Sequence, residues 1–144
     1  MELNEIQEKL CQQLSAKRMR HSLGVTETAM QLAQHYGVKV EEARLAGLLH
    51  DYARDLPPQT LLALAEKAGL IGCPVDHLAP DLLHGPVAAW LIPQEFGISD
   101  PNILHAVAVH TLGAEKMSCL DKIIYLADLI EPTRAYAGVE HLRA

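Results

Sequence analysis

The spacing of the apolar residues constrains the fold of this chain most strongly. They recur three and four positions apart, as in Leu3, Ile6, Leu10 and Leu14, which is the pattern of an amphipathic α-helix. No segment of useful length alternates apolar and polar residues as a strand would. One Phe and one Trp stand against many Leu and Ala, which favours helices packed through aliphatic side chains over a β-sandwich. We therefore predict an all-α bundle of about seven helices.

Turn and cap residues divide the chain into these helices. Gly37 is a stop signal for the second helix, and Pro57-Pro58 separates the third from the fourth. Residues 70–80 hold one glycine and two prolines and are expected to form a loop. A helical pattern resumes near Asp81 and is expected to break at Gly85-Pro86. That break would put His84 at a chain bend, directly before a new helix.

Length and composition indicate one domain over residues 1–144, without a repeat or a second domain. The sequence ends in what resembles the start of a helix, so the natural protein is expected to continue into a C-terminal helical tail. A net charge of −6 argues against binding a nucleic acid polymer. No apolar run has the length of a membrane span. Three cysteines without CxxC spacing suggest reduced thiols, so we expect a cytoplasmic protein.

Ionisable residues lie where an apolar helical face ends at several separate places in the chain. His50 and Asp51 follow Leu48-Leu49, and the same arrangement recurs elsewhere. The full set is His21, His50, Asp51, His84, His110 and Asp128. Burying such groups is costly unless they are paired or bind a metal. A single histidine beside apolar residues is more often an ordinary core residue than a ligand, but one shared metal centre would accommodate all six.

Imidazole and carboxylate ligands suit iron, manganese or zinc, and no thiolate is placed to help. Six ligands exceed what one catalytic metal needs if it keeps an open position, so the set favours two metal ions. Asp51 is then the candidate bridge between them, opposite a bridging hydroxide that serves as nucleophile. The remaining histidines are interpreted as surface or loop residues: His35, His77, His105 and His141.

The order His21, His50-Asp51, His84, His110 and Asp128 resembles the HD-domain metal-dependent phosphohydrolases, whose minimal pattern is H…HD…D. The local strings are similar to those of the bacterial YqeK family over essentially the whole chain. They are RMRHSLGV at 18–25, HDYAR at 50–54, LHGPV at 83–87, VHT at 109–111 and YLADLIEPTR at 125–134.

This resemblance implies an HD-domain hydrolase that cleaves diadenosine tetraphosphate symmetrically into two ADP at a dinuclear iron centre, with manganese or another first-row metal as the alternative. The six ionisable residues become its metal ligands, and Asp51 is also expected to orient the nucleophile. Arg18 and Arg134 match family arginines and suit bidentate phosphate binding. Lys122 and Thr111 are further candidates for phosphate contacts. Leu112 stands where the family has a small hydroxyl residue, which weakens the case for contacts from that loop.

Other readings of the same residues remain open. The chain is also compatible with an HD phosphohydrolase for a nucleoside monophosphate, a cyclic nucleotide or an alarmone. It is compatible with a nucleotide- or metal-binding module without turnover, or with a helical interaction domain whose histidines lie in its core. The expected partner is a dinucleoside polyphosphate or another nucleotide, and a homodimer is one possible assembly. If the chain ends at Ala144 without such a tail, nucleoside recognition is expected to be incomplete.

Overall fold

The computed structural model describes residues 1–144 and contains helices but no strand. Seven α-helices have nine or more residues, in agreement with the expected number. In chain order the elements are α1 (Leu3–Gln13), α2 (Ala16–Tyr36), α3 (Val40–Leu49), α4 (Pro58–Lys67), α5 (Val75–Leu78), the 3₁₀ helix η1 (Pro80–Leu83), α6 (His84–Phe96), α7 (Pro101–Val109), α8 (Cys119–Ile130) and α9 (Val139–Arg143).

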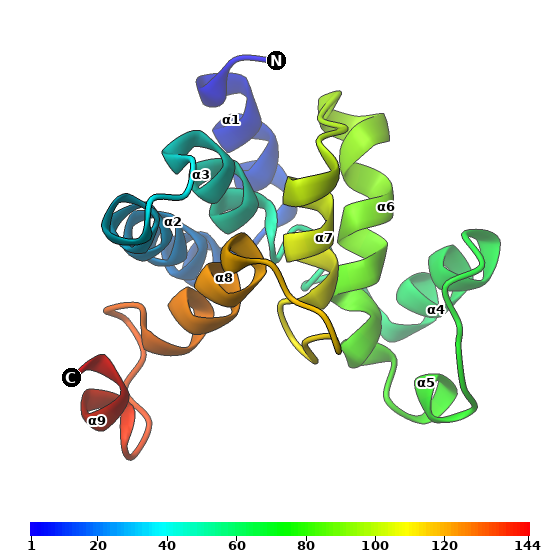
Figure 1. Ribbon diagram of the computed structural model, residues 1–144. Coiled ribbons are helices and arrows are strands. Elements are labelled where there is room, and N and C mark those ends of the chain that lie inside the picture. Colours follow the sequence, from blue (N-terminus) through cyan, green and yellow to red (C-terminus); the bar gives the residue numbers. More distant parts are fainter.

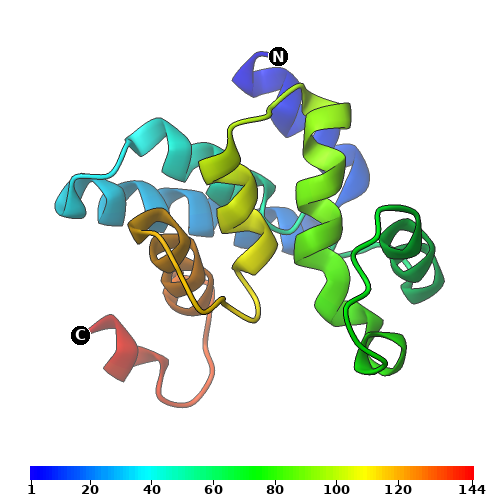
Figure 2. The same ribbon diagram turned by 45° about the vertical axis from the view of Figure 1, so that its right-hand side comes forward.

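Four helices, α2, α3, α7 and α8, form the centre of the bundle (Figure 1). The long α2 packs against α3 and α8, and α7 packs against α3, α6 and α8. Helices α4 and α5 lie beyond α6, whereas α9 lies on the opposite side, next to α8 (Figures 1 and 2). One apolar cluster joins α1, α2, α3, α4, α6, α7 and α8, with Leu10, Leu49, Ile92 and Ile124 fully enclosed. Burial of each such side chain contributes about 1.5–3 kcal/mol, so the bundle is a rigid frame for polar groups.

The capping signals of the sequence operate as expected. Gly37 ends α2 with a φ of 72°, the left-handed conformation that glycine adopts without strain. Asp100 accepts a hydrogen bond from the backbone N–H of Asn102 at the start of α7. Ser118 and Asp121 form a reciprocal capping box at the start of α8, with aspartate in place of the usual glutamate or glutamine. Helix α8 is thereby fixed at the end opposite Asp128.

Two local predictions were wrong. Residues 70–80 are not all loop, because α5 forms a single turn within them. Gly85-Pro86 does not break a helix either, since α6 begins at His84 and both residues lie in its first turn. The first backbone N–H groups of a helix have no partner within it, so a proline there costs little. His84 is therefore the first residue of α6 and not part of a bend before it.

Gly85 also allows α6 to approach α7 closely. A Cβ at this position would lie 2.9 Å from the carbonyl oxygen of Ala108 and 3.0 Å from that of Val107. A larger residue would force the two helices apart and separate His84 from His110. None of the helices combines the length and the apolar character needed to cross a membrane.

Candidate metal centre

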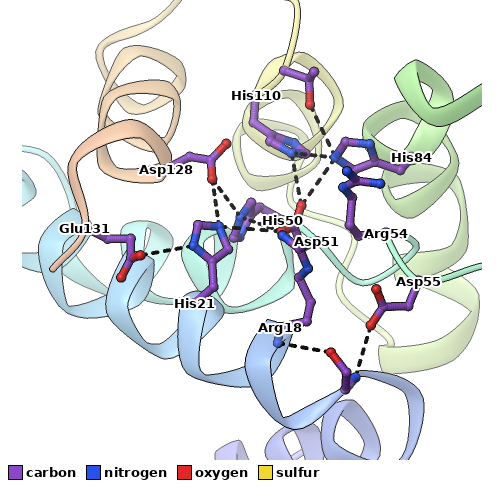
Figure 3. Close-up of polar contacts among 12 residues, drawn as sticks. Arg18, His21, His50, Asp51, Arg54, Asp55, His84, His110, Asp128 and Glu131 are labelled. Carbon is purple, nitrogen blue, oxygen red and sulfur yellow. Dashed lines mark hydrogen bonds and ion pairs between the residues drawn. The ribbon is translucent and has the colours of Figure 1, made fainter. Parts of the chain in front are cut away.

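The six predicted ligands come together in the middle of the bundle, although they lie on five helices or directly after them (Figure 3). His21 is in the second turn of α2, Asp128 is in the last turn of α8, and His50 and Asp51 directly follow α3. His84 opens α6 and His110 directly follows α7. The four histidines and Asp51 are buried, and Asp128 is half-buried.

Asp51 is at the centre of this cluster, and its two carboxylate oxygens face different pairs of histidines. Oδ1 lies 3.3 Å from His84 Nε2 and 3.4 Å from His110 Nε2. Oδ2 lies 3.4 Å from His50 Nε2 and 3.6 Å from His21 Nε2. One carboxylate can therefore serve two neighbouring groups of nitrogen ligands.

Asp128 makes its short contacts with only one of these two groups, although its carboxylate also lies within 4.8 Å of His110. Its Oδ1 lies 2.7 Å from His21 Nε2 and 3.6 Å from His50 Nε2. Three overlapping triads of potential ligand atoms, each with all its atoms within 4.8 Å of one another, include every predicted ligand. They are His21–His50–Asp51, His50–His110–Asp128 and Asp51–His84–His110.

The orientation of the imidazoles fits metal binding. His50, His84 and His110 each place Nδ1 against the backbone carbonyl three residues earlier, at 2.7, 2.6 and 2.7 Å. An Nδ1–H that donates to a carbonyl leaves the Nε2 lone pair free, and all three Nε2 atoms face Asp51. His50 Nε2 is buried and has no hydrogen-bond partner, a cost that a metal ligand would not incur. The donor set of imidazoles and carboxylates thus suits first-row metal ions.

The same proximity perturbs the protonation equilibria. Burial alone would lower the pKa of His50, but the adjacent Asp51 and Asp128 outweigh burial and raise it to about 10. Burial opposes ionisation of Asp51, yet the surrounding histidines hold the pKa of its carboxyl well below the usual range. The pKa of Asp128 is lowered by His21 and His50 in the same way. Burial lowers the pKa of His110, which favours the neutral imidazole that a metal requires.

Both predicted phosphate-binding arginines lie at the edge of the centre. Arg18 Nη1 donates to Asp51 Oδ2 at 3.1 Å, and Arg134 Nη2 donates to Asp128 Oδ1 at 3.0 Å. The two line a cavity of about 300 Å³ that reaches His21. Lys17, which the sequence analysis did not select, lines it as well. In a chain of net charge −6, three cations around one cavity make a local site for anions.

The two other predicted phosphate contacts are placed differently. Thr111 Oγ1 lies 3.3 Å from His84 Nε2, so its hydroxyl is part of the cluster. Lys122 is exposed on α8 and lines a separate cavity with Leu112 and Tyr125, without a polar contact to the cluster. The three cysteines are exposed and free, in agreement with the expected reduced thiols.

Glu131 is a polar neighbour of the cluster that the sequence analysis did not select. It is fully buried, and its Oε1 lies 3.3 Å from His21 Nδ1 (Figure 3). Burial opposes its ionisation, but hydrogen bonds from Thr133 and the contact with His21 keep the pKa of its carboxyl below the usual value. Glu131 follows the apolar pair Leu129-Ile130, so the criterion that selected Asp128 would also have found it.

Comparison with known proteins identifies the family of this chain. The HD domain profile matches residues 18–133. The symmetrical bis(5'-nucleosyl)-tetraphosphatase of Bacillus subtilis is 39% identical over 132 residues, which are 92% of this chain and 70% of that protein. The protein of the same name from Halalkalibacterium halodurans is 40% identical over 130 residues, covering 90% of this chain and 69% of that protein.

A solved structure has the same fold. The crystal structure of a Clostridium acetobutylicum protein, described as a predicted HD superfamily hydrolase involved in NAD metabolism, superposes with a TM-score of 0.96. It is 40% identical in sequence, and the match covers 99% of this chain and 76% of that one. By sequence and by fold, this chain belongs to the HD-domain hydrolases, in the group of the symmetrical bis(5'-nucleosyl)-tetraphosphatases.

Proposed function

We propose that this protein hydrolyses diadenosine tetraphosphate symmetrically, giving two ADP, at a centre of two metal ions. The observation that carries the proposal is the position of Asp51, whose Oδ1 faces His84 and His110 while its Oδ2 faces His21 and His50. A single ion would leave one of these sets unused. The names of the bacterial relatives supply the substrate.

Two ligand sets follow from these contacts. One ion would be held by His21, His50, Asp128 and Asp51 Oδ2, and the other by His84, His110 and Asp51 Oδ1. We propose iron for both, as the resemblance to the YqeK family implies, with manganese or another first-row metal as the alternative; the nitrogen and oxygen donors without thiolate fit each of these. When bound, the metals supply a hydroxide nucleophile at neutral pH and neutralise charge on phosphoryl oxygens.

The protein's own contribution is to position the substrate and to compensate its charge. Arg18 and Arg134 each use one guanidinium nitrogen on a ligand carboxylate, which leaves other N–H groups for phosphate oxygens. Lys17 adds a third cation beside the same cavity. If the outer phosphates bind in this cavity, a central phosphorus would lie over the cluster. One of these cations would then lie beside the new terminal oxygen of the departing ADP and stabilise its charge. Thr111 is proposed to donate a hydrogen bond to a phosphate oxygen near His84.

Product analysis tests this assignment. The protein, loaded with Fe(II) or Mn(II) without oxygen, should convert diadenosine tetraphosphate into ADP alone, and Asp51→Asn should remove the activity. Formation of ATP and AMP would refute symmetrical cleavage. A panel with a nucleoside monophosphate, a cyclic nucleotide, an alarmone and NAD would identify another HD phosphohydrolase. Tight binding of ADP without turnover of any substrate would indicate a binding module.

Three further predictions accompany the proposal. Residues 1–144 are proposed to act as one HD domain. A cytoplasmic location and a homodimer stay predictions that fractionation and sedimentation can test.

A further inference from the structure

We infer that Glu131 is a positioning residue for His21, and that Gly24 provides the space it occupies. The inference rests on the proposed metal centre, because it concerns how one of its ligands is oriented. His21 is the one imidazole of the cluster whose Nδ1 contacts a side-chain carboxylate and not a backbone carbonyl, so its orientation depends on that side chain.

The other three histidines all occupy helix ends. His50, His84 and His110 are the C-cap residues of α3, η1 and α7. The last carbonyls of a helix have no partner within it, so each of these histidines can direct Nδ1 to the carbonyl three residues earlier. The backbone thereby fixes ring orientation and tautomer without any other side chain.

His21 lies inside the 21-residue helix α2, where carbonyls are used by the helix itself. Its Nδ1 instead faces Glu131 Oε1, at 3.3 Å. An ionised carboxylate only accepts hydrogen bonds, so Nδ1 carries the hydrogen there and Nε2 is the atom left for a metal. Nε2 lies 2.7 Å from Asp128 Oδ1 and 3.6 Å from Asp51 Oδ2, on the side where the proposed ion would bind.

The carboxylate of Glu131 is itself fixed from several sides. The backbone N–H of Thr133 donates to Oε2 at 3.0 Å, and the Thr133 hydroxyl donates to Oε1. Arg143 of α9 donates to the backbone carbonyl of Glu131 at 2.8 Å. The side chain is fully buried, so water does not compete for its oxygens. This arrangement holds the acceptor in place before any metal binds.

Gly24, one turn after His21 on α2, leaves the volume that the carboxylate fills. A Cβ at position 24 would lie 2.1 Å from Glu131 Oε2 and 3.1 Å from its Cδ. The obstructing atoms are the end of a side chain, so Gly24→Ala would displace the carboxylate without forcing the helices apart. Alanine is also the better helix former by about 1 kcal/mol, so a structural role alone predicts little loss of stability.

The effect on the metal centre should be selective. A carboxylate behind the imidazole makes His21 a stronger ligand than its three carbonyl-supported partners, and loss of such a partner typically weakens metal binding about 10–100-fold. The ion held by His21, His50 and Asp128 should be affected, and the ion held by His84 and His110 much less.

The experiment compares Glu131→Gln and Gly24→Ala with matched controls. Glu27→Gln removes an exposed carboxylate from α2, the helix that carries His21, and Gly72→Ala adds a methyl group in open space. Mn(II) affinity is measured against a competing chelator, and the melting temperature is measured on metal-free protein. Nitrogen-15 NMR of the Zn(II)-loaded protein reports the His21 tautomer.

We expect both test variants to bind one Mn(II) about 10–100-fold more weakly while both controls match the wild type. The Nδ1–H proton of His21 should resonate further downfield in the wild type than in Glu131→Gln, because an amide oxygen is a weaker acceptor than a carboxylate. Wild-type affinity in both test variants, with only a lower melting temperature in the metal-free state, would overturn the inference and leave the proposed function intact. A wild-type protein that binds no Mn(II), Fe(II) or Zn(II) would overturn both.

Discussion

Replacement of His84 by alanine should remove one of the two proposed metal ions and leave the other. The proposed ion beside Asp51 Oδ1 would have three protein ligands, and the variant would leave it with two. The proposed ion beside Asp51 Oδ2 would keep all four of its ligands. The metal content should therefore fall from two ions per chain to one. Since loss of a single hydrogen-bond donor to a developing oxyanion costs about 10²–10³ in kcat, loss of an ion should reduce kcat at least about 100-fold.

Metal content is measured by elemental analysis after loading with Fe(II) without oxygen, and kcat by ADP formation. His35→Ala is the matched control, because His35 is an exposed imidazole on α2 that should affect neither quantity. Two ions per chain in His84→Ala would refute the assignment of His84 as a ligand. No ions at all would refute the independence of the two ligand sets.

Three other perturbations follow from the same geometry. Arg134→Ala should lower kcat/KM about 10- to 100-fold, because a charge-assisted hydrogen bond contributes about 1.5–3 kcal/mol. Arg134→Lys should retain only part of the wild-type kcat/KM, and full activity in the alanine variant would exclude a phosphate contact. Removal of the metals with a chelator should lower the melting temperature, since a ligand present at 100 times its Kd stabilises the folded state by about 2.7 kcal/mol; identical calorimetric traces would argue against a structural contribution of the metals. The pKa of His50 is raised to about 10, so this imidazole is protonated at neutral pH when no metal is bound. Metal binding should therefore release a proton, and the metal affinity should rise about tenfold per pH unit between pH 7 and 9. Calorimetric titrations in buffers of different ionisation enthalpy measure that proton, and a pH-independent affinity would contradict it.

The sequence predicted that these histidines and aspartates cluster, because most of them share a recognisable position. His50, His84, His110 and Asp128 each follow an apolar run, and burial at the end of such a run requires a partner. The sequence could not predict which side chains of the cluster lie next to one another. Which oxygen of Asp51 faces which histidine depends on how α2, α3, α6 and α7 cross, and no local pattern encodes those crossings.

The errors have separate causes. A proline breaks a helix interior but is tolerated in a first turn, so Pro86 does not end a helix. Glu131 follows an apolar pair, which the criterion applied to Asp128 would have selected, but its contact with His21 spans 110 residues and no local pattern indicates it. Lys17 lies in the basic segment Lys17-Arg18-Met19-Arg20, where the sequence alone does not distinguish it from Arg20. Only the structure shows that Lys17 lines the cavity beside His21 and that Arg20 does not.

The central claim is that Asp51 bridges two metal ions, and a crystal structure of the metal-loaded protein tests it most directly. Anomalous scattering recorded at the absorption edge of the loaded metal locates each ion independently of the protein atoms. We expect two peaks roughly 3.5–4 Å apart, with Asp51 Oδ1 bound to the ion beside His84 and His110 and Oδ2 bound to the ion beside His21 and His50. A single peak, or two peaks with Asp51 bound to only one of them, would contradict the claim.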